Sequence, residues 1–481
     1  MADILSPSSL KALADVEILL PADPLYGIRE RSYHAANARL APSCIARPTS
    51  APQVASLLRE LAASKTEFAV RGGGHSPVPG ASDIASGGVT VELGLLNKVT
   101  YDAAGETVRF GAGARWRDVY GELAKYQRAV PGGRSGGVGV SGLLLGGGSS
   151  WQVAKHGWAC DNVMSFEVVL GDGRIVTADK DTHADLFRAL KGGANNFGIA
   201  TSFVNRTHSS DRIWGGIAAN PESATGQILR AVRNFTQRQG QGEARDSYLM
   251  AVFGYFPDFG ANVGSTAVFQ AGSNPSGPEF EEWRALPKIV DMTKETTMAA
   301  LAEEITLPAN YHDAWFTLCI KNDEKIMKKA TDAHETLVAE LKSYISDGNF
   351  ITNCIFQPVP RTVSQRTAAA GGNIMGTERI AEDAVLFQLA VMTETAEQAR
   401  WAHPKLQRCV DALRDFAAEK EVEGGGGLMD WVYMNYADAS QDVIGSYGAE
   451  NVEKMRRVAV KYDPELVFQK LCPGGWKIPG L

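Results

Sequence analysis

Residues 131–148, PGGRSGGVGVSGLLLGGG, hold nine glycines in 18 positions and allow several interpretations. Gly137, Gly139 and Gly142 spell G-x-G-x-x-G, the pattern of a dinucleotide-binding turn. Residues 133–137 spell G-x-S-x-G, the pattern of a hydrolase nucleophile elbow. A third interpretation is a glycine-lined groove for an extended, phosphate-bearing cofactor, and a fourth is a flexible loop.

The surrounding sequence argues against both motifs. A dinucleotide-binding fold needs a buried strand before the first glycine, a helix after the last, and an acidic residue further on, for which Asp161 is suitably placed. VPGGRSG is instead turn-forming, and LLLGGGSS would put three consecutive glycines in that helix, each costing about 1 kcal/mol relative to alanine. A nucleophile elbow also lies between a strand and a helix, and 50 of the 481 residues are glycine, so a chance match is unsurprising. We expect neither motif to function.

A second glycine-rich loop, VRGGGHSPVPG at 70–80, favours the cofactor groove. Residues 71–82 and 131–160 contain no Asp or Glu, whereas they include Arg71, Arg134 and many unobstructed backbone N–H groups. A pyrophosphate needs close backbone approach, donors, and no carboxylate to repel it. The two loops are therefore predicted to form opposite walls of one groove, with a pair of flexible loops as the alternative.

The composition limits the class of partner. A net charge of -7 and a pI near 5.7 argue against nucleic acid or an anionic membrane, because phosphate binding needs clustered Lys and Arg. No apolar run approaches the roughly 20 residues of a membrane span. The six cysteines lie far apart without a C-x-x-C pair, so we expect no metal site, although a disulfide or two is possible. A small-molecule partner is expected.

The first 20 residues, MADILSPSSLKALADVEILL, lack the basic start and continuous apolar core of a signal peptide. As written, the chain is expected to be intracellular. A secreted or endomembrane location is the alternative if a leader has been removed.

Hydrophobic periodicity predicts an alternation of short elements in the first 208 residues. We expect, in order, a helix at 49–63 capped by Ser50, a strand at 68–71, a meander at 89–113 turning at 103–105, a helix at 114–127, and a hairpin at 163–178 turning at Asp172–Gly173.

Beyond residue 208 longer helices alternate with strands, which predicts an antiparallel sheet with helices on one face. Expected helices are 223–238, 279–304, 324–345 and 396–420, and expected strands are 248–255, 266–270, 314–320, 350–357 and 384–392. After GGGG at 424–427 we expect an aromatic strand, LMDWVYMNYAD at 428–438, a helix at 450–463, and a loop-like tail.

Seven blocks of this sequence resemble, in order, the FAD-linked oxidases of the vanillyl-alcohol-oxidase type. They are VRGGGHS, ELGLLNKV, GAGARWRDVY, VGVSGLLLGGG, HGWACDNV, DLFRALKGGANNFGIAT and YMNYAD. The likeness covers about residues 20–205 and 430–478 and is greatest to fungal members of the berberine-bridge-enzyme-like branch. It implies an α+β fold, with a two-part FAD-binding domain of the PCMH type at 1–208 and 430–481. Residues 209–429 would form the substrate domain, an antiparallel sheet with helices on one face.

The resemblance also implies a cofactor site. His75 would bond covalently to the flavin 8α-methyl group. The cofactor-binding residues implied are Arg71, Gly72, Gly73, Gly74, His75, Ser76, Gly137, Val138, Gly139, Ser141, Gly142, Gly146, Ile199 and Asn435. Val138 occupies the position that gates oxygen, where valine favours an oxidase.

Two positions depart from the family pattern. Bicovalent members carry a cysteine bonded to flavin C6 where this chain has Ser135, so we expect FAD to be held by one bond. Leu143 replaces a histidine that hydrogen-bonds near flavin N1, and a buried charge without a donor is costly. Another group, a backbone N–H or Asn435, would have to help.

Flavin oxidation of an alcohol or amine needs a general base to take the proton. A strand at 428–438 would put Tyr433 and Asn435 on one face and Tyr436 on the other. In the resembling family a tyrosine of this block serves as base, so we predict Tyr433 as base and Asn435 as flavin contact, with Tyr436 as the alternative base. All three could instead be sheet-core residues. A tyrosine base needs a neighbouring cation or donor, because its ordinary pKa is about 10; the sequence does not identify that group.

The predicted function is an FAD-dependent oxidase of fungal secondary metabolism. It would move a hydride from an alcohol or amine to covalently bound flavin, which O2 reoxidises to give H2O2. A carbohydrate oxidase is one alternative, which Ser135 weakly disfavours because sugar oxidases of this branch are mostly bicovalent. A cyclase or pericyclase, in which flavin is structural or prepares the substrate, is another. The oligomeric state is left open.

Overall fold

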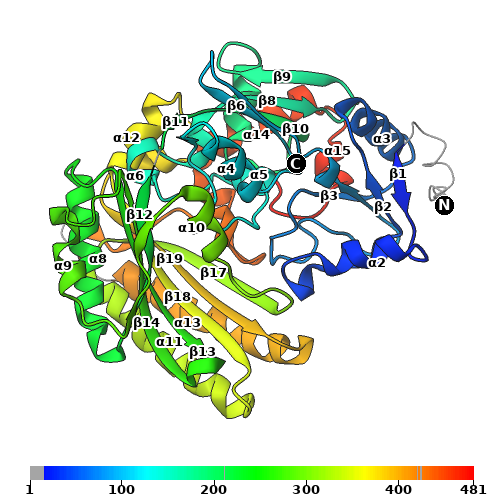
Figure 1. Cartoon of the computed structure of the whole chain (residues 1–481). Coiled ribbons are helices and arrows are strands. Elements are labelled where there is room, and N and C mark those ends of the chain that lie inside the picture. Colours follow the sequence, from blue (N-terminus) through cyan, green and yellow to red (C-terminus); the bar gives the residue numbers. More distant parts are fainter. Residues whose placement is uncertain (1–15, 211, 420, 423–424) are drawn as a thin grey trace.

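The computed structural model describes residues 16–210, 212–419, 421–422 and 425–481, in which three larger β-sheets organise the chain (Figure 1). The first 15 residues of the segment tested for a signal peptide, the last residue of the helix expected at 396–420, and the first glycine of 424–427 lie outside the described residues.

A four-stranded sheet carries the first glycine-rich loop. Its strands lie in the order β1 (Glu17–Leu19), β2 (Cys44–Arg47), β4 (Val89–Glu92) and β3 (Phe68–Arg71). The strand β4 is parallel to both β2 and β3, and all four of its residues are buried. The predicted meander is therefore wrong at this point, because strands of parallel sheets are covered on both faces and pair with distant segments.

The helix α3 (Ala51–Ala63) packs on this N-terminal part. The Ser50 side chain caps it by accepting a hydrogen bond from the Gln53 N–H at 3.4 Å. Val54, Leu57, Leu58 and Leu61 are buried, as the helical period predicted. The preceding helix, α2 (Pro24–Arg31), was not predicted.

A five-stranded antiparallel sheet lies beside the first. Its order is β5 (Val99–Asp102), β6 (Thr107–Gly111), β10 (Ile199–Arg206), β8 (Val163–Val169) and β9 (Ile175–Asp179). Both predicted hairpins, β5–β6 and β8–β9, are confirmed. The shorter helices of this part are α4 (Trp116–Ala124), α5 (Val140–Leu145), α6 (Val153–His156) and α7 (Ala184–Leu190).

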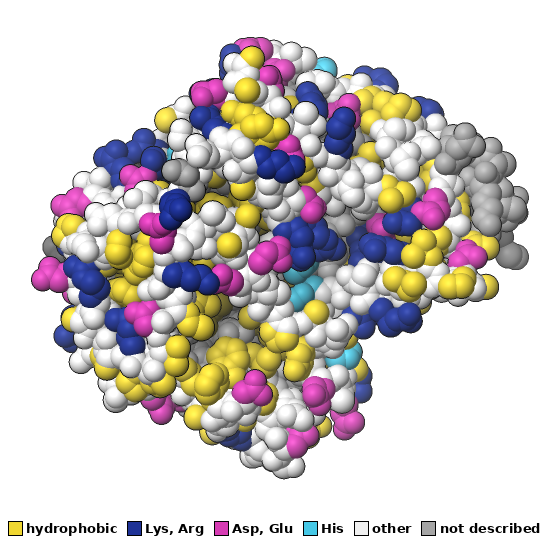
Figure 2. Space-filling view, in the orientation of Figure 1, with side chains coloured by type: hydrophobic (Ala, Val, Ile, Leu, Met, Phe, Trp, Pro, Cys, Tyr) yellow, Lys and Arg dark blue, Asp and Glu magenta, His cyan; other side chains and the backbone are white. Residues whose placement is uncertain are grey.

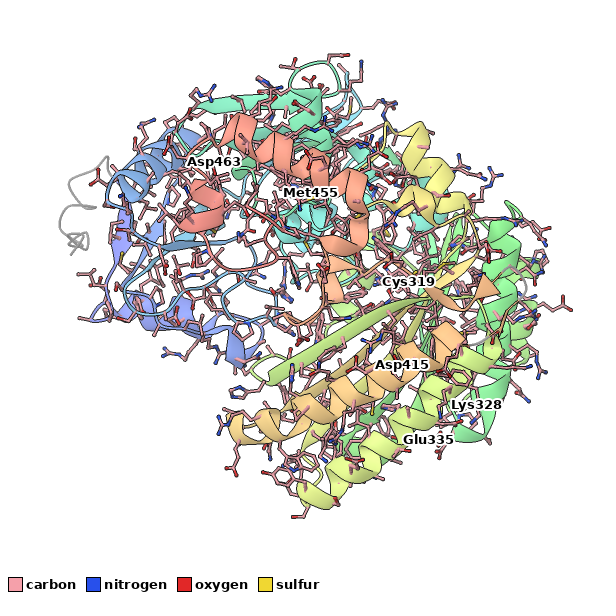
Figure 3. All side chains as sticks on the ribbon, turned by 180° about the vertical axis from the view of Figure 1, so that it is seen from behind. Cys319, Lys328, Glu335, Asp415, Met455 and Asp463 are labelled. Atoms are coloured by element: carbon pink, nitrogen blue, oxygen red, sulfur yellow. The ribbon has the colours of Figure 1, made fainter. Side chains whose placement is uncertain are left out.

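The largest sheet is antiparallel and is covered by helices on one face. Its strands include, in order, β12 (Ile213–Asn220), β14 (Ala261–Ala271), β13 (Ser247–Phe256), β18 (Phe350–Val359), β19 (Ala384–Thr393), β17 (His312–Lys321) and the edge strand β22 (Leu428–Met429). The covering helices are α8 (Thr225–Gly240), α11 (Glu324–Tyr344) and α13 (Ala396–Glu419). Figure 3 shows α11 and α13 side by side across the sheet. The expected architecture of this region is confirmed, although β12 and α12 (Thr362–Ala369) were missed.

The opposite face of this sheet packs toward the two smaller sheets. Met250, Cys319 and Leu386 belong to the same hydrophobic core as α4 and the C-terminal helix α14 (Ala449–Tyr462), whereas Phe316 and Phe356 pack into a second core under the helices.

The C-terminal segment returns to the N-terminal half (Figure 1). The Phe68 N–H donates to the Leu471 carbonyl at 2.7 Å, and the Asn196 side chain donates to the Trp476 carbonyl at 3.0 Å. The tail contains a short helix, α15 (Val467–Lys470), where only a loop was expected.

Two expected elements are wrong. Residues 279–304 form α9 (Glu281–Ala285), β15 (Val290–Asp291), β16 (Lys294–Thr296) and α10 (Met298–Glu304) in place of one helix. Pro287 accounts for the break, because it pushes Leu286 into an extended conformation. Residues 428–438 contain only the two-residue β22 and a 3-10 turn, Met434–Tyr436, in place of an aromatic strand.

No helix among the described residues is long and apolar enough to span a membrane. All six cysteines are free thiols. Within the same residues, no group of three or more His, Cys, Asp or Glu side chains could hold a metal ion.

Candidate active site

The two glycine-rich loops touch through their backbones. A Cβ atom on Gly73 would lie 2.5 Å from the Gly139 backbone, and one on Gly139 would lie 2.5 Å from the Gly73 nitrogen. A Cβ on Gly72 would lie 2.1 Å from the Ser141 hydroxyl oxygen. The first loop leaves the carboxyl end of β3, the edge of a parallel sheet at which ligands commonly bind.

Arg115 connects the same two loops. One guanidinium nitrogen donates to the Gly73 carbonyl at 3.0 Å and another donates to the Gly137 carbonyl. Burial lowers the pKa of Arg115, and the nearby Arg71 and Arg117 lower it further. A half-buried cation thus bridges the two loops.

Arg71, at the start of the first loop, is held by hydrogen bonds to other parts of the N-terminal region. Its guanidinium donates to the Arg29 carbonyl at 2.8 Å, to Ser32 Oγ at 2.7 Å and to Glu92 at 3.4 Å, and it stacks on Tyr33 at 3.6 Å. Its Nε has no partner among the described residues. Most of its hydrogen-bonding capacity is therefore used by the protein.

His75 is half-buried beside a second histidine and two arginines. Its ring stacks on that of His34, with centroids 4.4 Å apart and planes 19° apart. Burial lowers the pKa of His75 to about 3, with contributions from His34, Arg115 and Arg117. The imidazole is therefore neutral near pH 7 and keeps a nitrogen lone pair. Figure 2 shows basic and histidine side chains at the edge of a hollow in this face, with hydrophobic side chains across it.

The three polar residues of the aromatic block lie close together. The Tyr433 hydroxyl accepts hydrogen bonds from the Ser149 N–H at 2.6 Å and from Asn435 Nδ2 at 3.1 Å. The rings of Tyr433 and Tyr436 meet edge to face at 4.9 Å. The expected separation onto two faces is wrong, because this backbone forms a 3-10 turn.

Tyr433 is the less accessible of the two tyrosines. Its side chain is 1% exposed and stacks on Trp158, and burial raises its pKa above the ordinary value. The nearby Tyr436 acts in the same direction.

Tyr436 contacts a half-buried cation. Arg134 donates from one guanidinium nitrogen to the Tyr436 hydroxyl and from another to Met250 Sδ at 3.3 Å. Burial by itself would lower the pKa of Arg134, but Tyr436, Tyr248 and Tyr433 together raise it. The Tyr436 hydroxyl also donates to Gln357 Oε1 at 3.3 Å. Arg134 was expected to serve a pyrophosphate, and the structure places it at the tyrosines instead.

Asn435 adjoins the position where the family pattern has a histidine. Its amide nitrogen donates to the Leu143 carbonyl at 3.1 Å, in addition to Tyr433. A Cβ on Gly146 would lie 1.9 Å from Asn435 Oδ1, so Gly146 provides the space for this side chain. Because both amide protons of Asn435 are engaged here, it is not free as the donor expected near Leu143.

The other expected residues lie along the same loops, apart from Ile199. Ser76 accepts from the Val78 N–H at 3.3 Å, and Val138 is half-buried with its carbonyl accepting from the Trp116 N–H at 3.0 Å. Gly142 is exposed, with nothing within 4 Å of a Cβ placed on it. Ile199 is buried at the start of β10, where it pairs with Val169.

The dinucleotide interpretation fails on Asp161. Its carboxylate accepts from Thr367 at 2.7 Å, from Asn373 at 3.1 Å and from the Trp158 N–H at 3.0 Å, so it is not free to bind a ribose. A helix does begin after Gly139, which corrects the expectation that none would form there. That helix, α5, ends before the three consecutive glycines.

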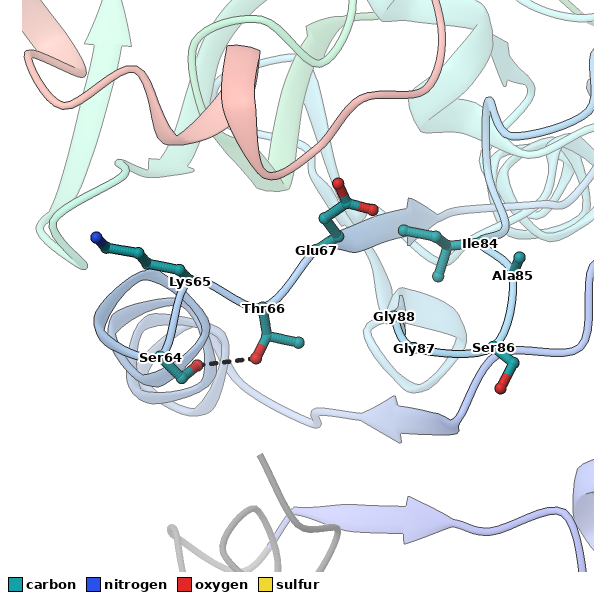
Figure 4. Close-up of a pocket in the computed structure, with 9 residues that line it drawn as sticks. All are labelled: Ser64, Lys65, Thr66, Glu67, Ile84, Ala85, Ser86, Gly87 and Gly88. Carbon is teal, nitrogen blue, oxygen red and sulfur yellow. Dashed lines mark hydrogen bonds between the residues drawn. The ribbon is translucent and has the colours of Figure 1, made fainter. Parts of the chain in front are cut away.

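A cavity of about 330 Å³ lies elsewhere (Figure 4). Residues 64–67 and 84–88 line it, at the amino ends of β3 and β4. The glycine-rich loop leaves the opposite end of β3, and none of the expected site residues lines this cavity. It is not the candidate active site.

Known proteins share this sequence and fold. Residues 42–179 match the FAD binding domain family. The FAD-dependent monooxygenase drtC of Aspergillus calidoustus is 35% identical over 454 residues, covering 93% of this chain and 85% of the relative. The bifunctional solanapyrone synthase of Alternaria solani is 31% identical, covering 98% of this chain and 88% of the relative. The chain belongs to the berberine-bridge-enzyme-like FAD-linked oxidoreductases.

Solved structures of this fold extend over nearly the whole chain. Physcomitrella patens BBE-like 1 matches with a TM-score of 0.78 at 18% identity, over 96% of this chain and 97% of its own. A glucooligosaccharide oxidase of Acremonium strictum, described with a 6-S-cysteinyl, 8α-N1-histidyl FAD, matches with a TM-score of 0.76 at 20% identity over 98% of each chain. The expected α+β fold is confirmed.

The residues present fit the FAD that this berberine-bridge-enzyme-like chain binds. The contacting loops carry glycines where a Cβ would block the backbone, and the open position at Gly142 leaves room for a ligand. Neither loop contains a carboxylate, and His75 is neutral beside cationic side chains. These are the conditions that a dianionic cofactor requires.

The sequence did not predict Arg115, His34 or Gln357 at this site. Arg115 belongs to the block GAGARWRDVY, but one arginine in an amphipathic helix start gives no specific signal. His34 and Gln357 lie in segments without a recognisable motif, and only the fold brings them to His75 and Tyr436.

Proposed function

We propose that the protein is an FAD-dependent oxidase acting on an alcohol or amine of fungal secondary metabolism, with O2 as electron acceptor and H2O2 as product. FAD supplies the hydride acceptor when it is bound. Residues 1–208 and 430–481 hold the cofactor in this proposal, and residues 209–429 bind the substrate. The contact between Arg134 and Tyr436 carries the proposal, because it provides a base with an adjacent cation.

Tyr436 is the proposed base in preference to Tyr433. A guanidinium against the Tyr436 oxygen stabilises negative charge when the proton leaves, and two unit charges 4 Å apart interact by about 4 kcal/mol at an effective dielectric constant near 20. Tyr436 is half-buried, whereas Tyr433 is fully buried with a raised pKa. Tyr433 then orients Asn435 and the Ser149 backbone.

His75 is the proposed point of covalent attachment, as an 8α-histidyl link. Its burial and low pKa keep the ring neutral, which a nitrogen nucleophile requires. With Ser135 where bicovalent relatives have cysteine, the attachment is through one bond. The half-buried Val138 supports access of O2, as a small side chain at the gating position.

A cyclase is the second candidate, because a relative is named bifunctional solanapyrone synthase.

The experiment that separates these functions incubates the holoenzyme with matched panels of alcohols, amines and oligosaccharides. It measures flavin bleaching under anaerobic conditions and peroxide formation in air. Bleaching and stoichiometric peroxide with an alcohol or amine are expected. Bleaching by oligosaccharides alone would favour a carbohydrate oxidase. Product formation without bleaching or peroxide would overturn the oxidase and favour the cyclase.

A further inference from the structure

The face of the largest sheet opposite its helices carries buried polar atoms without partners. Among the described residues, no hydrogen-bond partner exists for either carboxylate oxygen of Asp313 or for Trp315 Nε1, Asn353 Nδ2 and Gln357 Nε2. Asp313 and Trp315 alternate on β17 with Ala314 and Phe316, which pack under the helices, so they point to the other side. Trp315 and Asn353 share a row across the sheet through Ala390.

Four residues of this face, named here the polar row (Asp313, Trp315, Asn353 and Gln357), extend along the strands toward the proposed base. Trp315 and Asn353 lie on one level, Asp313 lies two residues to one side of it on β17, and Gln357 lies four residues to the other side on β18. Gln357 contacts the Tyr436 hydroxyl at 3.3 Å, and the Trp315 ring lies 6.2 Å from the Tyr436 ring. Asp313 is two residues from Trp315 along the strand, roughly 7 Å further.

Asn37 attaches this end of the row to the His75 loop. Its amide donates to the Pro77 carbonyl at 2.7 Å and to the Asp313 carbonyl at 3.0 Å, and its oxygen accepts from the Asp313 N–H at 2.9 Å. The Asp313 backbone is therefore fixed, while its carboxyl group has no hydrogen-bond partner in the part of the chain that the structure describes.

Among the described residues, Asp313 is the only buried carboxylate with neither oxygen hydrogen-bonded; Glu30 lacks a partner at one oxygen only. Glu92 pairs with Arg29 at 2.9 Å and Arg47 at 3.1 Å in addition to Arg71, and Asp161 accepts three hydrogen bonds. Asp313 is 6% exposed, and burial raises its pKa to about 7. A buried acid left without a partner destabilises a fold, so such a residue points to a ligand.

We propose that the polar row selects the substrate: its three N–H donors bind oxygen atoms on the side of the oxidised carbon, and Asp313 pairs with a basic amino group roughly 7 Å beyond Trp315. The inference rests on the proposed function only for the position of the oxidised carbon. An amino group fits better than a hydroxyl, because it offers several donors and a charge to a carboxyl group with both oxygens free.

The test uses three probes of equal length on the holoenzyme: 4-phenylbutylamine, 4-phenylbutanol and 4-phenylbutyrate. Binding is followed by tryptophan fluorescence and the flavin spectrum. The wild type is expected to bind the amine at least about tenfold more tightly than the alcohol, with the carboxylate weakest. Asp313→Asn should remove the preference for the amine and leave alcohol binding within about twofold. Glu335→Gln, at an exposed acid on α11 in the helix layer, is the matched control and should change nothing (Figure 3).

Equal affinity for the three probes in the wild type, or an amine preference that survives Asp313→Asn, would overturn the inference. The binding readout does not require turnover. An intact amine preference without peroxide formation from any substrate would contradict the proposed function alone, so the two failures are distinguishable.

Discussion

The guanidinium of Arg134 donates a hydrogen bond to the hydroxyl of Tyr436, although 302 positions separate the two residues in the chain. Arg134 belongs to the second glycine-rich loop and Tyr436 to the turn after β22. In the proposed mechanism this loop therefore supplies the cation that a tyrosine base needs, in addition to a wall of the cofactor groove.

The first prediction separates the two tyrosines. Tyr436→Phe should retain yellow, flavin-loaded protein but lose at least about 100-fold in kcat, the usual size of a general-base contribution. Tyr433→Phe should lose less than about tenfold, because Tyr433 accepts structural hydrogen bonds from Ser149 and Asn435. Steady-state kinetics at matched flavin content make the comparison. If Tyr433→Phe is inactive and Tyr436→Phe is active, Tyr433 is the base instead of Tyr436.

The second prediction concerns the cation. Removing the positive charge with Arg134→Met should move the rising limb of the kcat/KM profile to higher pH by about one unit or more, because negative charge on the Tyr436 oxygen loses its stabilisation. Arg134→Lys should recover part of the shift, since it keeps the charge without the forked geometry. A pH profile unchanged in Arg134→Met would show that the guanidinium has only a packing role.

The third prediction tests the contact between the loops. Gly73→Ala would place a Cβ 2.5 Å from the Gly139 backbone, so the apo protein should lose about 1–3 kcal/mol of stability and bind less FAD. Gly121→Ala is the control: it lies in α4 with nothing within 4 Å, and alanine there should stabilise by up to about 1 kcal/mol. Thermal unfolding and flavin content would be measured together. Equal stability of both variants would contradict the tight contact.

The fourth prediction concerns attachment of the cofactor. Acid precipitation of the wild type should leave the flavin with the protein, and His75→Ala should release it to the supernatant. His156→Ala removes a histidine from another half-buried stacked pair, with His208, and should leave the link intact. Mass analysis of the peptide that carries His75 identifies the bond. Free flavin from the wild type would exclude covalent attachment.

Much of this fold could be predicted because it follows local patterns. The amphipathic period of α3 and the turn residues between β8 and β9 depend on neighbours in the sequence, and both elements formed as expected. The strand β4 and the turn at Tyr436 could not be predicted, because distant partners decide them. Val89 and Val91 are buried by pairing with β2 and β3, and the tyrosine turn packs against Trp158 and Ser149.

The candidate active site could likewise be predicted only where its residues belong to local sequence motifs. His75 and the glycines stand in recognisable motifs, whereas Arg115 and Asp313 do not. What distinguishes Asp313 is the absence of a hydrogen-bond partner among the described residues, a property of the folded chain that no sequence pattern encodes.

The fifth prediction concerns the pH dependence of stability at Asp313. Burial raises its pKa to about 7 in the folded protein, against about 3.9 when unfolded. The folded state therefore keeps the Asp313 proton to higher pH than the unfolded state does. The free energy of unfolding of the wild type, relative to that of Asp313→Asn, should fall by up to about 4 kcal/mol as pH rises from about 4 to 7, and then level off. Thermal unfolding at pH 4.5, 6 and 8 would compare three ligand-free proteins: the wild type, Asp313→Asn, and Asp347→Asn as a control at an exposed site. Asp313→Asn should match the wild type at pH 4.5 and exceed its melting temperature at pH 8, while Asp347→Asn should follow the wild type throughout. A lower melting temperature for Asp313→Asn at pH 8 would mean that the carboxylate stabilises the fold through a partner, contrary to a residue kept free for a ligand.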